Sequence, residues 1–360
     1  MNNFISGLEL SRYFFEESVR PILKKHFPKL KYSAALIGYG SEVLGFDTPL
    51  SRDHAWGPRL LLFVREKDYS RRKHMSRIFS QELPYTFRGY STNFGKPDKF
   101  GVRHMVSIKS GPINHKVDIF TLKSFLELRL CIDQKQKLSS LDWLSMPQQR
   151  LLEITSGAIF YDGLGELTKI RKKLNYFPRD VWLYLLASQW QKLSQEEAFV
   201  GRTGAIGDEL GSQLVAARLV RELMRLCFLI ERKYFPYSKW FGSAFQKLEC
   251  SKKLSPILRK VFLAKLWKER ERYLGRAYSI VAQMHNALHI AKALPTKVSK
   301  YHARPFHVIH ADAFADAIKG KIKNAQLKKL ELVGSVDQFT NVSSNTELCK
   351  WLKTAYIQKR

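Results

Sequence analysis

The stretch Gly40–Arg59, GSEVLGFDTPLSRDHAWGPR, decides the fold of the N-terminal part of this chain. Two apolar runs bound it: Ala34–Ile37 comes before it and Leu60–Val64 comes after it. Short apolar runs next to turn residues are typical of buried strands, so the stretch is predicted to join two strands of one sheet. Gly40 and Ser41 would then form a tight loop, in which glycine lets backbone amides approach an anion and serine adds a hydroxyl donor.

The end of the same stretch, Ser51-Arg52-Asp53-His54-Ala55, enters the second apolar run. Residues two apart on a strand point to the same face of the sheet. We therefore expect Asp53 and position 55 to look toward the Gly-Ser loop together.

This pattern resembles the DNA-polymerase-β-like nucleotidyltransferases, a superfamily that includes the kanamycin and streptomycin nucleotidyltransferases. More narrowly, it is similar to a bacterial group still filed as a domain of unknown function. Three later stretches strengthen the resemblance and extend it over most of the chain: GDELGSQLVAARLVRELMRLCFLIERKYFPYSKWFG, RPFHVIHADAFADAI and GSVDQF. The resemblance implies magnesium ions and a nucleoside triphosphate, ATP first among the candidates, as cofactor and substrate.

Position 55 departs from the pattern, because the resemblance implies a second aspartate there and this chain has Ala55. An alanine side chain cannot bind a cation, so the protein as written is expected to be catalytically impaired. The change is either natural divergence or a deliberate substitution, and the intact motif around it favours an engineered inactive variant. Asp47, in the same linker, is interpreted as a turn former rather than a replacement ligand.

Asp118 lies in the run 115–120, HKVDIF, among apolar side chains. A carboxylate in such surroundings is costly unless it is paired or bound to a metal. The resemblance implies a third carboxylate on a strand beside the first motif, and Asp118 matches it. We expect Asp53 and Asp118 to be catalytic magnesium ligands, with Ala55 at the missing position. The alternative for Asp118 is an edge-strand aspartate that faces solvent.

A second set of candidates lies in the expected helix over residues 208–234. The resemblance implies a general base from this half of the molecule, and Glu209 is the candidate, while Asp208 is predicted to cap the helix. The two acids could also exchange roles, or both cap the helix.

Guanidinium groups bind phosphate bidentately and lysine binds it as a point charge. The candidate nucleotide-binding residues are Gly40, Ser41, Arg52, Arg218, Arg221 and Lys239. For the arginines, Arg59 included, structural ion pairs are the alternative.

The net charge of +29, from 61 Lys and Arg against 32 Asp and Glu, favours a polyanionic partner larger than a nucleotide. The alternative is a lysine-rich, solvated surface. Residues 252–276 carry nine basic side chains against two acids, with aromatic residues among them, and 319–329 adds five lysines with no acid. Such segments track a phosphate backbone while aromatic rings stack on bases. The candidate nucleic-acid-binding residues are Lys252, Lys253, Arg259, Lys260, Lys265, Trp267 and Arg270.

The predicted fold class is α+β, with an N-terminal nucleotidyltransferase-type mixed sheet and helices followed by an α-helical domain. The predicted domains are 1–135, 136–295 and a basic C-terminal extension, 296–360. The expected strands are 33–39, 55–64, 85–90, 103–109 and the run around Asp118. The expected helices are 8–27, 69–83, 122–131, 147–160, 178–194, 208–234, 255–290 and 312–323.

The predicted function is transfer of a nucleoside monophosphate from a nucleoside triphosphate to a hydroxyl of RNA such as tRNA, with Mg²⁺ and release of pyrophosphate. A protein-modifying, AMP-adding toxin or effector, for which an antitoxin would be a partner, is one alternative. A non-catalytic nucleic-acid-binding protein that kept the fold is another. No apolar run approaches the ~20 residues of a membrane span and the four cysteines form no CxxC pair, so a cytoplasmic protein without membrane contact is expected.

Overall fold

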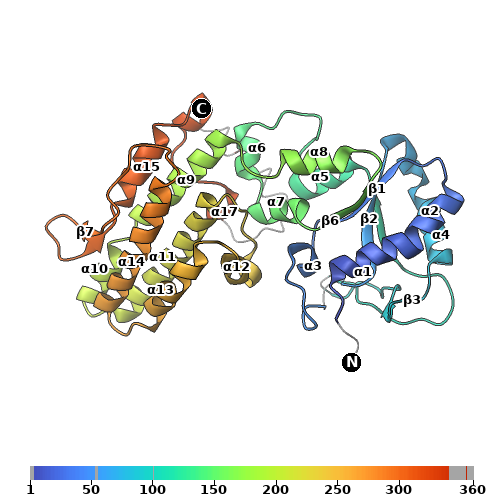
Figure 1. Cartoon of the computed structure of the whole chain (residues 1–360), viewed down its shortest axis with the longest axis horizontal. Coiled ribbons are helices and arrows are strands. Elements are labelled where there is room, and N and C mark those ends of the chain that lie inside the picture. Colours follow the sequence, from blue (N-terminus) through green and yellow to red (C-terminus); the bar gives the residue numbers. More distant parts are fainter. Residues whose placement is uncertain (1–3, 53–55, 100, 340–353, 355–360) are drawn as a thin grey trace. The chain divides into compact units, whose positions relative to one another are not determined.

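The computed structural model describes residues 4–52, 56–99, 101–339 and 354 (Figure 1). Asp53, His54 and Ala55 lie outside the described residues. Contacts divide the chain into two compact units, and each is described by itself. The sheet unit contains residues up to 138 together with 150–175, and the helical unit contains 139–149 and the described residues from 176 onward.

A four-stranded mixed sheet forms the centre of the sheet unit, with the strand order β5-β2-β1-β6. Strand β1 pairs antiparallel with β2 and with β6, whereas β2 and β5 run parallel. The end of β1 and the starts of β2 and β5 therefore meet at one edge of the sheet. The strands are β1 (Tyr32–Leu36), β2 (Arg59–Val64), β5 (Lys116–Phe120) and β6 (Ala158–Asp162).

Strand β2 is buried along its whole length because helices cover both faces of the sheet. Leu60, Leu62 and Val64 join the core formed by helix α1 (Gly7–Phe14) and its neighbours. On the other face, Phe63 packs edge-on against Phe125 of helix α5, with ring centroids 5.3 Å apart. This two-sided burial explains the continuous apolar run that the sequence shows after the first motif.

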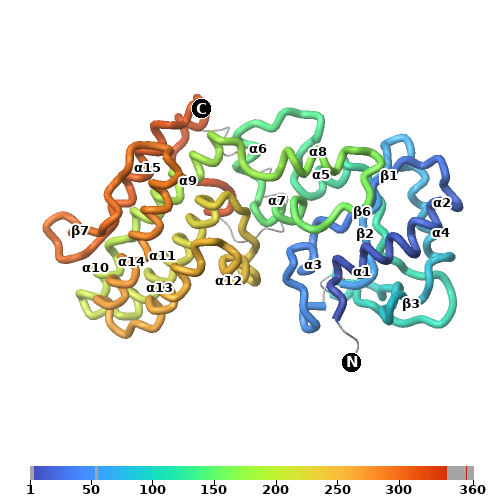
Figure 2. Tube along the Cα trace, in the orientation of Figure 1, coloured from blue at the N-terminus to red at the C-terminus, as the bar shows by residue number. Residues whose placement is uncertain are grey.

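The other elements of the sheet unit surround these strands, and Figure 2 traces the chain through them. The predicted helix over 8–27 forms as two helices joined by a π-helical turn at Phe15–Val19. A 3-10 turn at Glu66–Arg71 leads into the helix predicted over 69–83. The remaining elements are α2 (Arg20–His26), α3 (Ser41–Leu44), α4 (Arg72–Glu82), β3 (Thr86–Phe87), β4 (Tyr90–Ser91), α5 (Leu122–Leu130) and α8 (Glu166–Lys173).

Three sequence-based predictions about this unit are wrong. The single strand expected over 85–90 forms as two short strands, β3 and β4, which pair with each other. The strand expected over 103–109 does not form, and only an isolated bridge joins Phe94 to Met105. The helix expected over 147–160 ends early, as α7 (Gln148–Thr155), and β6 follows it. A Cβ atom on Gly157 would lie 2.1 Å from the carbonyl oxygen of Leu36, so only glycine lets the chain pass close to β1 and pair with it.

The helical unit packs around α9 (Arg179–Ser194), which contacts α11 and α15 most extensively. Trp190 stacks on Phe314 at a centroid distance of 4.4 Å in this core. The helix predicted over 255–290 forms as two helices. The other elements are α6 (Ser140–Ser145), α10 (Phe199–Ala205), α11 (Glu209–Ile230), α12 (Ser238–Phe245), α13 (Ser251–Leu263), α14 (Trp267–Asn286), β7 (Ser299–Lys300), β8 (His307–Val308), α15 (Ala311–Lys319), α16 (Ala325–Lys329) and α17 (Val336–Phe339).

Together the mixed sheet and the helical unit give an α+β fold, as predicted. Residues 150–175, which the sequence analysis placed in the helical domain, group with the sheet unit because β6 pairs with β1. Within the described part of the chain, no helix combines the length and the apolar character needed to cross a membrane.

Candidate functional site

Arg59, the last residue of the opening motif and the first of β2, organises the sheet edge where β1 ends and β2 and β5 begin. Its side chain is 2% exposed and that of Glu42, its partner, is 1% exposed. Nε and Nη2 of Arg59 donate to Oε1 of Glu42 at 2.9 and 2.5 Å, and Nη2 also donates to the carbonyl oxygen of Tyr39 at 2.6 Å. Burial alone would lower the pKa of Arg59, but Glu42, Tyr39 and Asp118 outweigh it and raise that pKa.

The ion pair between Arg59 and Glu42 requires a glycine at position 40. Its φ of 124° lies in a region that favours glycine, and a Cβ atom there would lie 2.5 Å from Nη2 of Arg59 and from Oε2 of Glu42. The hydroxyl of Ser41 donates to the carbonyl oxygen of Ser51 at 3.1 Å, which ties the start of the linker to its end. The Gly-Ser loop is therefore built around a buried ion pair. A structural ion pair was the stated alternative for Arg59, but the sequence analysis did not identify Glu42 as its partner.

Asp118 lies on β5 opposite Leu61 of β2, on the face of the sheet that α5 covers. It is close enough to Arg59 to raise that residue's pKa. Its side chain is 34% exposed, and Oδ2 accepts a bond from Nζ of Lys116 at 3.0 Å. The structure thus places Asp118 on the strand next to β2, as one member of an ion pair with Lys116.

Three cationic side chains lie around the ring of Tyr39 at this edge. The Arg59 guanidinium lies 4.5 Å from the centre of its ring, and the Lys116 ammonium and the Arg129 guanidinium each lie 5.9 Å away. Arg129, on α5, is held in turn by an ion pair with Glu153. The edge therefore presents a half-buried aromatic ring among three cations, each of which is paired with a carboxylate.

Asp47 belongs to the architecture of this edge. Its Oδ2 accepts a bond from the Gly7 amide at 2.6 Å and one from the indole Nε1 of Trp56 at 3.1 Å. These bonds hold the start of α1 and the buried Trp56 side chain against the linker, so both of the described contacts of this carboxylate oxygen are structural. These contacts do not support a metal-binding role for Asp47, which the sequence analysis had set aside.

Replacing Asp47 with alanine is expected to destabilise the sheet unit by about 1–3 kcal/mol, because a buried indole N–H and an amide lose their acceptor. Asp47→Asn keeps an acceptor oxygen and should retain most of the stability. Glu127→Gln, which removes an exposed ion pair with Lys123, is the matched control and should change the unfolding free energy by less than about 1 kcal/mol. Chemical denaturation measures all three, and an Asp47→Ala protein as stable as the control would contradict this role.

The described residues do not by themselves make a magnesium site. Within those ranges, no group of three or more His, Cys, Asp or Glu side chains gathers as a metal-binding cluster. Asp118 is the one predicted ligand among them; it is paired with Lys116 and faces Arg59, which disfavours a divalent cation. Asp53 lies outside the described residues, and Ala55 supplies no ligand. We therefore derive no chemical step through a metal for the chain as written.

Glu209 and Asp208 have separate structural roles in the helical unit. Asp208 caps α11 by accepting a bond from the Gly211 amide at 2.7 Å, as predicted. The Glu209 carboxylate accepts bonds from the Trp267 amide at 3.1 Å and from Nη1 of Arg270 at 3.0 Å. These contacts join the start of α11 to the start of α14, and they account for Glu209 without a catalytic role.

Arg270 is not available to a nucleic-acid backbone, which corrects the prediction for this residue. Its side chain is 1% exposed. The guanidinium also donates to the Ser212 hydroxyl at 2.7 Å and to the carbonyl oxygen of Ala264 at 3.0 Å. The basic pattern of the segment could not show this, because the sequence shows the charge of an arginine but not whether its side chain is buried.

The other predicted basic residues have varied surroundings. Arg218 is exposed and forms an ion pair with Glu196, and Lys239 lies 5.0 Å from the Trp240 ring. Arg221 has its pKa lowered by burial and by Arg225. Arg52, at the sheet edge, donates to the carbonyl oxygen of Pro49 at 2.9 Å. Of the residues predicted to bind nucleic acid, Lys252, Lys253, Arg259, Lys260 and Lys265 are exposed, and Trp267 is half-buried.

Comparison with known proteins adds one family. Residues 143–241 match a family model described as "Domain of unknown function (DUF4037)". This range includes most of the stretch from Gly207 to Gly242 on which the resemblance to such a group rested, and it ends before α13. The Gly-Ser motif lies outside it.

No curated protein matches this chain. Among solved structures, the chain is similar to a nucleotidyltransferase-like protein from Exiguobacterium sibiricum 255-15. The identity is 11% and the TM-score is 0.29, over 80% of this chain and 83% of that one. The α+β fold described above stands on this chain's own strands and helices.

Proposed function

We propose that this chain is a nucleotidyltransferase whose present form, with Ala55, is catalytically impaired. The form with aspartate at position 55 would transfer a nucleoside monophosphate from a nucleoside triphosphate, ATP first, to a hydroxyl of RNA such as tRNA. The acceptor oxygen would bond to the α-phosphorus and lose its proton to a base, while the bond from that phosphorus to the β-phosphate oxygen breaks and pyrophosphate leaves.

One observation carries this proposal: the Gly-Ser loop, the start of β2 and Asp118 all belong to one edge of a mixed sheet. Lys116 and Arg129, the less buried of the cations around Tyr39, would add positive charge beside the triphosphate there. Magnesium, when bound, would neutralise phosphate charge and align the reacting oxygen. Asp53, Asp118 and the introduced aspartate would be its protein ligands.

The test is to restore the motif with Ala55→Asp and incubate the protein with each α-labelled nucleoside triphosphate, Mg²⁺ and a cell lysate. We expect pyrophosphate release and label that migrates with RNA, whereas the protein as written releases little or none. Label on protein would instead support the AMP-adding alternative. A restored protein that labels nothing and releases no pyrophosphate with any of the four nucleotides would contradict the enzymatic proposal.

A non-catalytic nucleic-acid-binding protein is the second candidate. Ala55 and the pairing of Asp118 with Lys116 favour it, since both weaken a metal site. This alternative predicts that Ala55→Asp changes nothing in nucleotide chemistry.

A further inference from the structure

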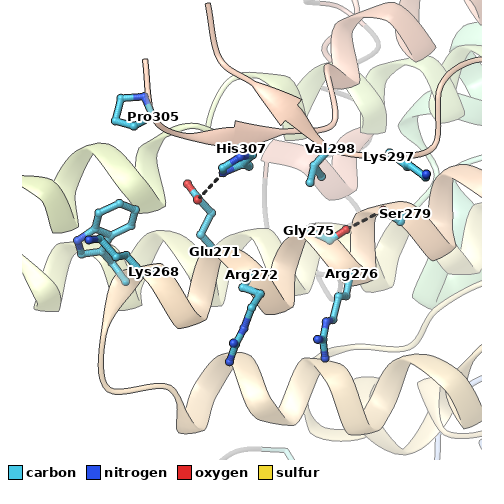
Figure 3. A pocket seen from close by; sticks show the side chains of 11 residues that line it. Lys268, Glu271, Arg272, Gly275, Arg276, Ser279, Lys297, Val298, Pro305 and His307 are labelled. Carbon is cyan, nitrogen blue, oxygen red and sulfur yellow. Dashed lines mark hydrogen bonds and ion pairs between the residues drawn. The ribbon is translucent and has the colours of Figure 1, made fainter. Parts of the chain in front are cut away.

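A pocket of about 830 Å³ opens in the helical unit, between α14 and the segment 297–307 that contains the β7–β8 hairpin (Figure 3). No residue predicted to bind the nucleotide lines it. Pockets of roughly 300–1,000 Å³ hold drug-sized ligands, so this one is large enough for a nucleoside. Its lining residues are Trp267, Lys268, Glu271, Arg272, Gly275, Arg276, Ser279, Lys297, Val298, Pro305 and His307.

The centre of the pocket is apolar. Gly275 lets Val298 approach α14, because a Cβ atom on this glycine would lie 3.3 Å from Val298 Cγ2. Trp267 lies at one end and is held in place: its ring packs against Phe306 at 6.0 Å, and its amide is bonded to Glu209. A fixed aromatic ring at the end of an aliphatic surface offers a flat face on which a nucleobase can stack.

The rim of the pocket is positive. Lys268, Arg272, Arg276 and Lys297 are all exposed. Figure 3 shows Arg272 and Arg276 extending from α14 on the side away from His307. The one acid in the lining, Glu271, faces the imidazole of His307, with Oε2 and Nδ1 3.3 Å apart. Lys268 and Lys297 therefore lie at the rim of an apolar centre whose single carboxylate is already engaged, and Arg272 and Arg276 add positive charge on the outer side of α14.

We propose that this pocket binds an unpaired base of single-stranded RNA, with the neighbouring phosphates on Lys268, Arg272, Arg276 and Lys297. The choice of RNA rests on the proposed function, in which RNA is the acceptor. An uncharged apolar ligand would make no use of these exposed cations, of which Arg272 alone has a carboxylate nearby within the described part of the chain, that of Glu269 at 3.9 Å. A duplex keeps its bases stacked inside, where Trp267 and Val298 cannot reach their faces. Single-stranded RNA offers both a π-face and a chain of phosphates.

The base contact is tested with the protein as written, without nucleotide, by fluorescence anisotropy of a labelled short oligouridylate. The same oligomer with one abasic position should bind roughly tenfold more weakly, the effect of losing one stacked base. Ser279→Phe, which fills the pocket from α14, should bind both oligomers equally weakly. Equal binding of the intact and abasic oligomers by the unmodified protein would overturn the proposal, and so would equal binding of duplex RNA.

The phosphate contacts are tested by reversing two charges at the rim with Lys268→Glu and Arg276→Glu. Lys169→Glu with Lys172→Glu on α8 is the matched control, because it changes the net charge by the same amount at exposed residues that do not line the pocket. The rim variant should lose about two from the slope of log affinity against log salt, and at least tenfold in affinity. If the control variant loses as much, attraction by overall charge explains binding and the pocket proposal is wrong.

These assays contain no nucleoside triphosphate and use the chain with Ala55. If these assays contradict the pocket proposal, pyrophosphate release by the Ala55→Asp protein can still test the proposed function. Conversely, base-dependent RNA binding would stand even if the restored protein released no pyrophosphate. Circular dichroism of each variant establishes that the fold is intact before affinities are compared.

Discussion

Replacing Arg59 with methionine is expected to destabilise the sheet unit by about 3–5 kcal/mol, more than any other single change discussed here. The substitution leaves the Glu42 carboxylate without its partner at a site where that side chain is 1% exposed. It also removes the donor to the carbonyl oxygen of Tyr39. Denaturant unfolding, followed with hydrogen exchange of the β1 and β2 amides, measures the loss.

A double-mutant cycle separates the ion pair from the packing around it. Glu42→Met alone should also be strongly destabilising, because it leaves the Arg59 guanidinium buried without its carboxylate partner. The double variant, Arg59→Met with Glu42→Met, should recover much of the loss, since apolar side chains of similar volume can replace a buried pair. Additive effects of the two single changes would show that Arg59 and Glu42 do not act as a unit.

Asp118→Asn, made in the Ala55→Asp protein, is expected to reduce pyrophosphate release by at least about a hundredfold, comparable to losing a group that stabilises transition-state charge. The amide keeps the shape of the side chain but removes the negative charge that a cation needs. Because Asp118 is one-third exposed, the same change should affect the unfolding free energy by less than about 1 kcal/mol. The measurement is the initial rate of pyrophosphate release under saturating nucleotide.

Glu127→Gln in the same Ala55→Asp background is the control, since it removes an exposed acid of α5 that is paired with Lys123. Its rate should equal that of the Ala55→Asp parent. A parent that is active and an Asp118→Asn protein with the same rate would remove Asp118 from the site while leaving the transfer reaction in place.

The sequence predicted most of the elements because each depends on a short window of the chain. The apolar run of β2 and the cap of α11 at Asp208 were both readable locally. One misjudged element, the strand β6, depends on a partner far away: Gly157 has to pass the backbone of Leu36 before Ala158 can pair with it. No local pattern distinguishes that strand from the continuation of α7.

The residues of the candidate site divide in the same way, into those that the sequence indicated and those that it did not. Asp118 was recognised because an acid in an apolar run is unusual, and the resemblance supplied its place. Glu42, beside the Gly-Ser pair, carried a weaker signal: an acid immediately after the loop and an arginine at the end of the motif. Tyr39 and Lys116 carried none, because a tyrosine after a strand and a lysine before one are ordinary residues in ordinary places.

The sequence by itself determined the α+β class, the two strands on either side of Gly40–Arg59 and the positive charge of the chain. These follow from periodicity, turn residues and composition, which short segments contain. Only the tertiary structure decided that Arg59 is buried against Glu42, 17 positions away, and that Arg270 is bound by Glu209, 61 positions away. A side chain's burial and its ionic partner are set by segments that meet only when the chain folds, so the pattern along the sequence does not contain them.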